Sequence, residues 1–512
     1  MFFARVSDKE EFLLRYCLFL LLIGLFVYPI IHANFYLIDD HGRALNPYIG
    51  MAANGRYLSE LLFIALNTSC HQHDIAPLTQ ILSVAILSLS LTSLSMAWRF
   101  NRLSGLLALS FIVCSPYFLE NLSYRVDSLY QSLALATAIA ALSLSVPMTG
   151  LRRYLTVALI LFLTVNLYQP AVNVFLVLLC LGTLFQMLEG GIKVASLYYV
   201  KNLLCLVAAL CAYKAETFLL HLEGFNFDYL HLHAATTSNP HLVARHIVQF
   251  LKLYLNEYAR GNHARILLIG LVGGVTGLGF QAYISRGIRG GIFAGFLLGL
   301  AILSMPGVML VLASPVFDAR VLMSGGAFLG LAICFLLGRD AAFRGWRRVP
   351  ILLSGWMLLT QLMMAYEWGN AAHAQALFEN RLAAEIVEDV YTASHGRPVA
   401  LRVFSSWGDS DPVPVDPKAR VIFDHRASLH LDALLPMFKI WGWNGVILKE
   451  FGLQSNATYL GFDEESPVFS MTEAAAMRHS CRFEHQIARR YYSLYQAGDR
   501  ILIDFSRACP IR

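Results

Sequence analysis

Charged side chains are scarce in this sequence. Asp, Glu, Lys and Arg make up 14% of its 512 residues, whereas a soluble globular protein carries about 25%. Between Glu11 and Trp368 the chain instead forms apolar runs of about 17–22 residues, each long enough to cross a bilayer as a helix. This composition excludes a soluble protein over most of the chain, although charged residues return from Ala372 onward.

The apolar runs predict about eleven transmembrane helices. The first run is too long for the apolar part of a signal peptide, so we expect an uncleaved first helix. Residues 1–371 would then form a membrane domain and residues 372–512 a soluble α/β domain. The expected helices start near residues 12, 77, 104, 128, 154, 171, 196, 265, 291, 321 and 349.

The distribution of Lys and Arg predicts the orientation of these helices. With the N-terminus inside, every short inner connection carries at least two cations, whereas the outer turns near Tyr168 and Phe317 carry none and one. This asymmetry follows the positive-inside rule. An odd number of spans then places the C-terminal domain outside, together with two long polar loops at residues 32–76 and 212–264.

Short apolar segments in the C-terminal region predict a small α/β or α+β domain. Cys481 and Cys509 lie in polar segments of this region, where they could form a disulfide if the domain lies in an oxidising compartment. Its aromatic residues could stack on sugars or pack in the core. The expected strands are 399–404, 421–423, 446–448 and 501–505, and the expected helices are 427–441 and 471–479.

Two adjacent acids, Asp39 and Asp40, follow the first expected span and precede His41 and Arg43. A partly desolvated carboxylate pair resists double ionisation. One member could therefore act as a base near neutral pH. The alternative is a solvated loop in which an Asp begins a short helix.

A second polar motif contains Glu120, Tyr124, Arg125 and Asp127, at the outer turn between two expected spans. Charges at such depth are costly, and they are usually paired or functional. An ion pair of Arg125 with Asp127 or with Glu120 could hold the turn, and a role in a site is the other interpretation.

The remaining outer turns carry Tyr168-Gln169-Pro170 and, later, Asp318 and Arg320. Tyr168 could lie in an interfacial aromatic belt, and the Gln169 amide could bind a sugar hydroxyl or the turn backbone. Arg320 can bind a phosphate bidentately or anchor the turn by pairing with Asp318. Together with the acid pair, these residues suit a site that receives a lipid-linked anionic substrate from the bilayer.

These motifs resemble the serotype-converting O-antigen glucosyltransferases of bacteria, the Gtr type. The likeness covers roughly residues 30–180, and its most specific part is the Tyr-Arg-x-Asp-Ser element at residues 124–128. The rest of the membrane region is similar in layout only, and the C-terminal domain carries no recognised motif. The shared elements are the Asp-Asp stretch, Gly55-Arg56, residues 74–78, residues 121–128 and residues 167–170.

The resemblance implies a GT-C-like enzyme that takes a hexose, glucose, from a polyprenyl-phosphate carrier at the outer face of the bacterial inner membrane. Asp39 or Asp40 would be the general base that activates a hydroxyl of a cell-envelope polysaccharide, and a single displacement would invert the anomeric centre. A donor-making glycosyltransferase and a flippase would be partners. Candidates for binding the substrates, including the leaving phosphate, are His41, Arg43, Arg56, Asp74, Glu120, Tyr124, Arg125, Asp127, Tyr168, Gln169 and Arg320.

No cofactor is expected, and a metal-independent mechanism is the working hypothesis, with a divalent metal left open. The Asp409-Ser410-Asp411 pattern is too short to define a metal site. The histidines of residues 212–264, such as His231 and His233, lack a clean ligand spacing.

The main alternative is a transporter or flippase of lipid-linked sugars. Transporters often show paired repeats and broken helices, whereas this sequence has no evident long repeat. Its polar residues also lie at the outer ends of spans, which favours chemistry at that face. Nucleic acid is not an expected partner, because no basic stripe is present.

Overall fold

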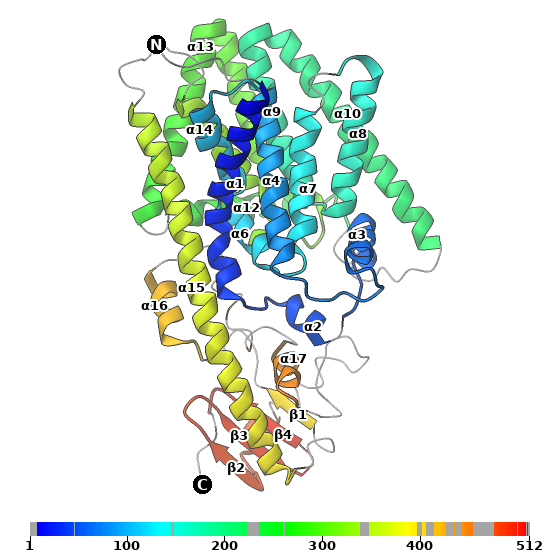
Figure 1. Ribbon diagram of the computed structural model, residues 1–512, viewed down its shortest axis with the longest axis vertical. Coiled ribbons are helices and arrows are strands. Elements are labelled where there is room, and N and C mark those ends of the chain that lie inside the picture. Colours follow the sequence, from blue (N-terminus) through cyan, green and yellow to red (C-terminus); the bar gives the residue numbers. More distant parts are fainter. Residues whose placement is uncertain are drawn as a thin grey trace. The chain divides into compact units, whose positions relative to one another are not determined.

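The computed structural model of the chain is mainly helical and includes a four-stranded sheet (Figure 1). It divides into two compact units, which are treated separately below. Unit 1 comprises Met1–His32, Ile49–Tyr366 and Arg426–Leu429, and unit 2 comprises Ala33–Tyr48, Glu367–His425 and His430–Arg512. The structure describes residues 8–45, 47–144, 148–222, 235–259, 262–337, 348–396, 402–405, 414–425, 435, 438, 443–453, 476–498, 500–507 and 509.

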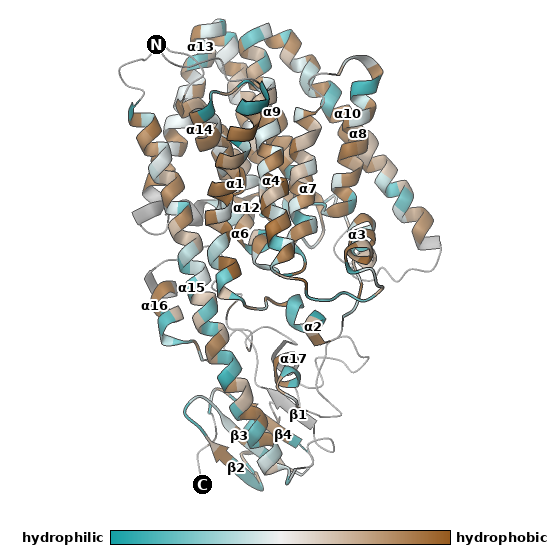
Figure 2. Ribbon diagram, in the orientation of Figure 1, coloured by the Kyte–Doolittle hydropathy of each residue, from teal (hydrophilic) through white to brown (hydrophobic). Residues whose placement is uncertain are grey.

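Long apolar helices dominate unit 1. In the described part of the chain, seven helices are long and apolar enough to cross a membrane. Hydrophobic residues predominate on α1 and α4, for example (Figure 2). The seven helices are α1 (Asp8–Ala33), α4 (Leu78–Ala97), α8 (Gly150–Leu167), α9 (Ala171–Gly190), α10 (Ile192–Leu222), α13 (Asn262–Ser304) and α15 (Arg348–Ala393).

Shorter and bent helices occupy the other expected spans. The segment α5–η2 (102–112) and α6 (Pro116–Ser123) meet at a bend of 64° and would form an eighth span. Two apolar helices, α7 (Ser128–Ser143) and α14 (Ser324–Leu337), are shorter. A kink at Gly287 divides α13 in two. Each residue at which a transmembrane helix was expected to start lies near the start of a helix or near this kink. The expected number of eleven transmembrane helices stays a prediction.

The two polar segments expected as outer loops contain regular structure. The first contains α2 (Asp39–Leu45), η1 (Ala52–Asn54) and α3 (Tyr57–Asn67). In the second, α10 continues to Leu222 and α12 (Pro240–Ala259) follows. His246, Phe250 and Tyr254, spaced four residues apart on α12, are buried, as expected for an amphipathic helix. The short helices η3 (Gly307–Val311) and η4 (Ala319–Val321) precede α14.

The sheet of unit 2 has the order β1-β4-β3-β2. A parallel pair joins β1 (Arg402–Ser405) to β4 (Arg500–Asp504), while β3 (Ser493–Ala497) pairs antiparallel with β4 and with β2 (His485–Ala488). The expected strand at 501–505 is thereby confirmed, and β1 overlaps the one expected at 399–404.

The strands expected at 421–423 and 446–448 are wrong. These segments lie within α16 (Pro417–His425) and α17 (Trp443–Glu450), because an apolar triplet does not distinguish a strand from a helix. The expected helix at 427–441 lies almost wholly outside the described residues. The one at 471–479 is described from residue 476, where the chain is helical.

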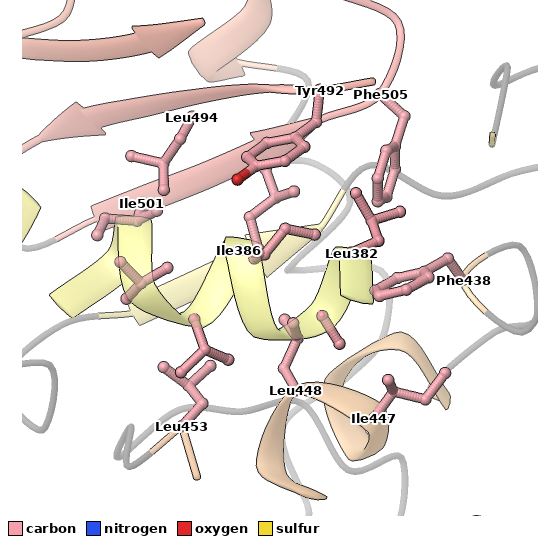
Figure 3. Close-up of a cluster of buried hydrophobic side chains, with 14 of the residues drawn as sticks. Leu382, Ile386, Phe438, Ile447, Leu448, Leu453, Tyr492, Leu494, Ile501 and Phe505 are labelled. Carbon is pink, nitrogen blue, oxygen red and sulfur yellow. The ribbon is translucent and has the colours of Figure 1, made fainter. Parts of the chain in front are cut away.

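The core of unit 2 forms around the last turns of α15, which pack between the sheet and α17 (Figure 3). Leu382 and Ile386 are one helical turn apart and face this core. On β4, Ile501 and Ile503 point into it, whereas Leu502 between them joins a second cluster with Tyr495 and Met477. Successive side chains of β4 point to opposite faces of the sheet, so unit 2 has one apolar layer on each face.

A disulfide joins Cys481 to Cys509 beside the second apolar layer, with 5.6 Å between the two Cα atoms. This separation lies within the range that a disulfide requires. The expected pairing is therefore present in the structure.

Candidate functional site

Arg56 lies at the start of α3, beside the turn that joins α8 to α9. Its Cζ atom lies 4.7 Å from the ring centroid of Tyr168, so the guanidinium rests on an aromatic face. Nε donates to Oε1 of Gln169 and Nη1 donates to the hydroxyl of Tyr130, each at 3.4 Å. These contacts orient the guanidinium at the ends of three helices of unit 1.

Gln169 fixes the turn that precedes Arg56. Its Nε2 donates to the carbonyl oxygens of Asn54 and Gly55, at 3.1 and 3.2 Å, and to the hydroxyl of Tyr213 at 3.0 Å. Gly55 has a φ of 69°, a left-handed conformation that suits glycine. Of the two roles considered for this amide, the structure shows the backbone one.

Arg320 lies in η4 and contacts three polar side chains, those of Glu120, Tyr124 and Asp318. Its backbone N–H donates to Oε2 of Glu120 at 2.8 Å, and its Nη1 donates to the hydroxyl of Tyr124 at 2.7 Å. Nη2 pairs with Oδ2 of Asp318 at 2.9 Å, so the expected anchoring pair is confirmed. The Glu120 side chain is 1% exposed and that of Arg320 is 25% exposed. A buried carboxylate that loses its cationic partner destabilises the fold.

Tyr168 contacts both Arg56 and Arg320, and so connects the residues around these two arginines. Its ring carries Arg56, and its hydroxyl donates to the carbonyl oxygen of Arg320 at 3.3 Å. The residue is 1% exposed, so the expectation of an interfacial belt residue is wrong. Burial raises the pKa of Tyr168 to about 12, which keeps it a neutral hydroxyl donor at physiological pH.

Arg125 forms an ion pair with Asp74. Nη2 and Nε of Arg125 lie 2.8 and 2.9 Å from Oδ2 of Asp74, a partner that the sequence analysis did not name for it. Thr79 at the start of α4 donates its hydroxyl to the carbonyl oxygen of Arg125. Asp127 is buried before the first turn of α7. This segment therefore ties α4 to the turn before α7.

The acid pair belongs to unit 2 and is described apart from the groups above. The helix α2 begins at Asp39, which confirms that an Asp begins a short helix there, but the segment is not the expected solvated loop because Asp40, His41 and Arg43 are buried. Asp40 is 1% exposed and its Oδ2 accepts a hydrogen bond from the backbone N–H of Leu37 at 3.3 Å. Asp39 is only partly buried. The two acids therefore differ in their access to a substrate.

His41 and Arg43 are also buried on α2. Nδ1 of His41 lies 2.7 Å from Oε1 of Glu450 on α17. The guanidinium of Arg43 lies 5.7 Å from the ring centroid of Tyr48. Both contacts lie within unit 2.

Two acidic residues with specific surroundings in the structure, Glu216 and Glu450, are not among the site residues expected from the sequence. Glu216 lies on α10, and its buried Oε2 has no hydrogen-bond partner among the described residues. An acid next to an apolar run is a signal that could identify it, but Glu216 falls within the loop expected at residues 212–264. Glu450 carried no local signal, because its contact with His41 spans 409 residues.

Among the described residues, no group of three or more His, Cys, Asp or Glu side chains could hold a metal ion. Asp409 and Asp411, like His231 and His233, lie outside those residues. Of the aromatic residues considered as sugar platforms, Tyr492 and Tyr495 are fully buried in the two apolar layers, which matches the core-packing alternative.

The fold and the polar groups at the helix ends define a polytopic helical membrane protein that has a small domain containing a sheet. Residues 28–331 match the model of the glucosyl transferase GtrII family, and the chain belongs to this family. It is therefore a glycosyltransferase, as the resemblance implied, and the match contains every site residue named from the sequence.

One relative is an uncharacterized 55.3 kDa protein from the gtrB 5' region of Salmonella phage P22. It is 24% identical to this chain over 392 residues, which cover 74% of this chain and 79% of the relative. No solved structure matches the chain.

Proposed function

We propose that the protein transfers a glucosyl group from a polyprenyl-phosphate donor to O-antigen or another cell-envelope polysaccharide. The observation that carries the proposal is the group formed by Arg56, Tyr168, Arg320 and Glu120, which lies inside the segment shared with the glucosyltransferase family. Family membership favours transfer over the alternative of transport.

The leaving polyprenyl phosphate requires positive charge near the membrane surface. Arg56 and Arg320 lie at helix ends of unit 1, and a planar guanidinium matches the geometry of a phosphate. Tyr168 contacts both residues, so it would hold them at a fixed separation. We therefore assign the phosphate of the donor to these two residues.

Asp39 is the proposed general base. It is the more accessible acid of the pair, whereas Asp40 is buried and engaged with the backbone of Leu37. The acceptor hydroxyl gives its proton to Asp39 as its oxygen bonds to the anomeric carbon. The bond from that carbon to the phosphate oxygen breaks, the electron pair leaves with polyprenyl phosphate, and the anomeric centre is inverted.

The reaction is proposed for the outer face of the bacterial inner membrane, with unit 2 in the periplasm. The Cys481–Cys509 disulfide supports this location, because disulfides persist in oxidising compartments and are rare in the cytosol. A donor-making glycosyltransferase and a flippase would then supply the lipid-linked sugar at that face.

The test uses the purified full-length protein in lipid, with polyprenyl-phosphate-glucose and O-antigen polysaccharide. We expect glucose transfer by the wild type, a loss of about 100-fold or more for Asp39→Asn, and donor binding unchanged in that variant. Asp40→Asn is the matched control for the base and should retain more turnover. Movement of the intact donor across the bilayer without transfer would overturn the proposal in favour of transport.

A further inference from the structure

His41 and Glu450 form a contact within unit 2 that joins residues 409 positions apart in the sequence. The two side chains are 9% and 14% exposed, and 2.7 Å separates Nδ1 from Oε1. A carboxylate offers only acceptors, so the proton of this hydrogen bond lies on Nδ1 of His41. The low local dielectric of a buried pair strengthens the bond.

The position of His41 is fixed from two further directions. Its backbone N–H donates to the carbonyl oxygen of Ile38 at 3.1 Å, and the Ile38 side chain packs against the core of unit 2. The ring of Tyr36 lies at a centroid distance of 5.4 Å. Within the described residues, no hydrogen bond to Nε2 of His41 is present. Glu450 therefore engages one ring nitrogen, and the other keeps an acceptor lone pair in the neutral ring.

We propose that Glu450 is a positioning residue of the glycosyl transfer, acting through His41. Its carboxylate holds His41 in the tautomer with the proton on Nδ1, so that Nε2 accepts a hydrogen bond from a sugar hydroxyl beside Asp39. The proposal rests on the proposed function, and it assigns to the C-terminal region a part in the reaction. Histidines held by a carboxylate in this way have a defined tautomer and ring orientation.

A purely structural contact is the competing explanation, in which the pair merely docks α2 on α17. Both explanations predict that removal of Glu450 changes stability. Both also place the proton on Nδ1 of His41, so they differ in whether the change of tautomer in a Glu450 variant is accompanied by a fall in kcat at an unchanged KM. The experiment therefore measures these quantities beside thermal unfolding.

Full-length protein in lipid is labelled with ¹⁵N-histidine, and the His41 signals are assigned by their disappearance in His41→Gln. Glu450→Gln can also donate to Nδ1, so we expect a signal from the tautomer protonated on Nε2 to appear. We expect kcat to fall about 10- to 100-fold, as for other residues that orient a functional histidine, with the donor KM within about twofold. Glu450→Asp should restore most of kcat, and the exposed Glu484→Gln is the matched control.

An unchanged tautomer in Glu450→Gln, or a kcat equal to that of Glu484→Gln, overturns the inference while glucose transfer by the wild type stands. A loss of kcat that only tracks a loss of folded protein overturns it as well. If the wild type transfers no glucose, the proposed function fails instead, and the tautomer measurement still shows whether Glu450 controls His41.

Discussion

The hydroxyl of Tyr168 donates to the backbone carbonyl oxygen of Arg320 at 3.3 Å. This hydrogen bond joins the turn between α8 and α9 to η4, across 152 residues of sequence. The ring of the same tyrosine supports Arg56. One side chain thus links the two arginines that we assign to the donor phosphate.

Replacement of Tyr168 should separate its two contacts. Tyr168→Phe keeps the aromatic face under Arg56 and loses one hydrogen bond, so we expect transfer within about fivefold of the wild type and a stability loss of about 1 kcal/mol. Tyr168→Ala also loses the cation–π contact and should reduce transfer further. Initial rates at saturating acceptor measure this, and equal rates for the two variants would contradict the role of the ring.

Arg320 should stabilise unit 1. Arg320→Met removes a guanidinium that lies 3.9 Å from Oε1 of the buried Glu120 but keeps the backbone N–H bond to Oε2, so we expect a loss of about 1–3 kcal/mol. The double variant with Glu120→Gln should recover much of this loss, because the buried charge is then gone. Unfolding in detergent, followed by tryptophan fluorescence, measures both variants. A double variant no more stable than Arg320→Met would show that the pair is not the cause.

The left-handed backbone conformation of Gly55 restricts which residue types position 55 accepts. A β carbon at a φ of 69° costs about 1–2 kcal/mol, so Gly55→Ala should destabilise the turn and raise the donor KM. Gly55→Asn should be milder, since asparagine tolerates this conformation. The comparison needs donor-binding isotherms for both variants, and an alanine variant that binds as well as the wild type would refute it.

The disulfide of unit 2 can be tested without an activity assay. Alkylation of the non-reduced protein, followed by mass spectrometry, should leave Cys481 and Cys509 unmodified while the exposed Cys70 reacts. Replacement of both half-cystines by serine should destabilise unit 2 by about 2–5 kcal/mol. Full alkylation of both residues in protein from intact cells would contradict the bond and the proposed location.

Tyr492 should make unit 2 sensitive to alkaline pH. Burial and its hydrogen bond to Asp389, at 2.6 Å, raise the pKa of Tyr492 in the folded state. A raised pKa gives stability that is complete below the unfolded value of about 10 and is lost as the pH rises toward the folded value. Tyr492→Phe should lose stability at neutral pH and show a shallower loss above about pH 10.

The control for this pH dependence is Tyr491→Phe, which alters a less buried neighbour. Unfolding midpoints between pH 7 and 11 provide the measurement for both variants. An alkaline slope that is the same in wild type and Tyr492→Phe would assign the loss of stability to other groups.

The sequence predicted the positions of the helices well because an apolar run of span length has few alternatives to a helix. It predicted β4 as a short apolar segment rich in β-branched residues, whereas the strands expected at 421–423 and 446–448 were wrong because three apolar residues carry no period. Polar residues at helix ends were recognised from their cost in a membrane. That reasoning selected Glu120, and the guanidinium geometry selected Arg320; the structure brings the two residues into contact.

Pairing over long sequence distances was not predictable. The Arg125–Asp74 ion pair and the His41–Glu450 contact depend on how α4, α7, α2 and α17 pack. No local pattern encodes that packing, because either residue of each pair could be solvated in a different fold. A buried polar pair can be identified only when the structure shows that both partners are buried and in contact.

Unit 2 is discontinuous in sequence, because Ala33–Tyr48 belongs to it although this segment precedes most of unit 1. A chimera that exchanges only the C-terminal third between two family members would therefore bring Glu450 of one parent against His41 of the other. Under the proposed role of Glu450, we expect functional exchange only when residues 33–48 are exchanged together with the C-terminal region. In evolution, these two distant stretches of the gene would have to be inherited together, or change together.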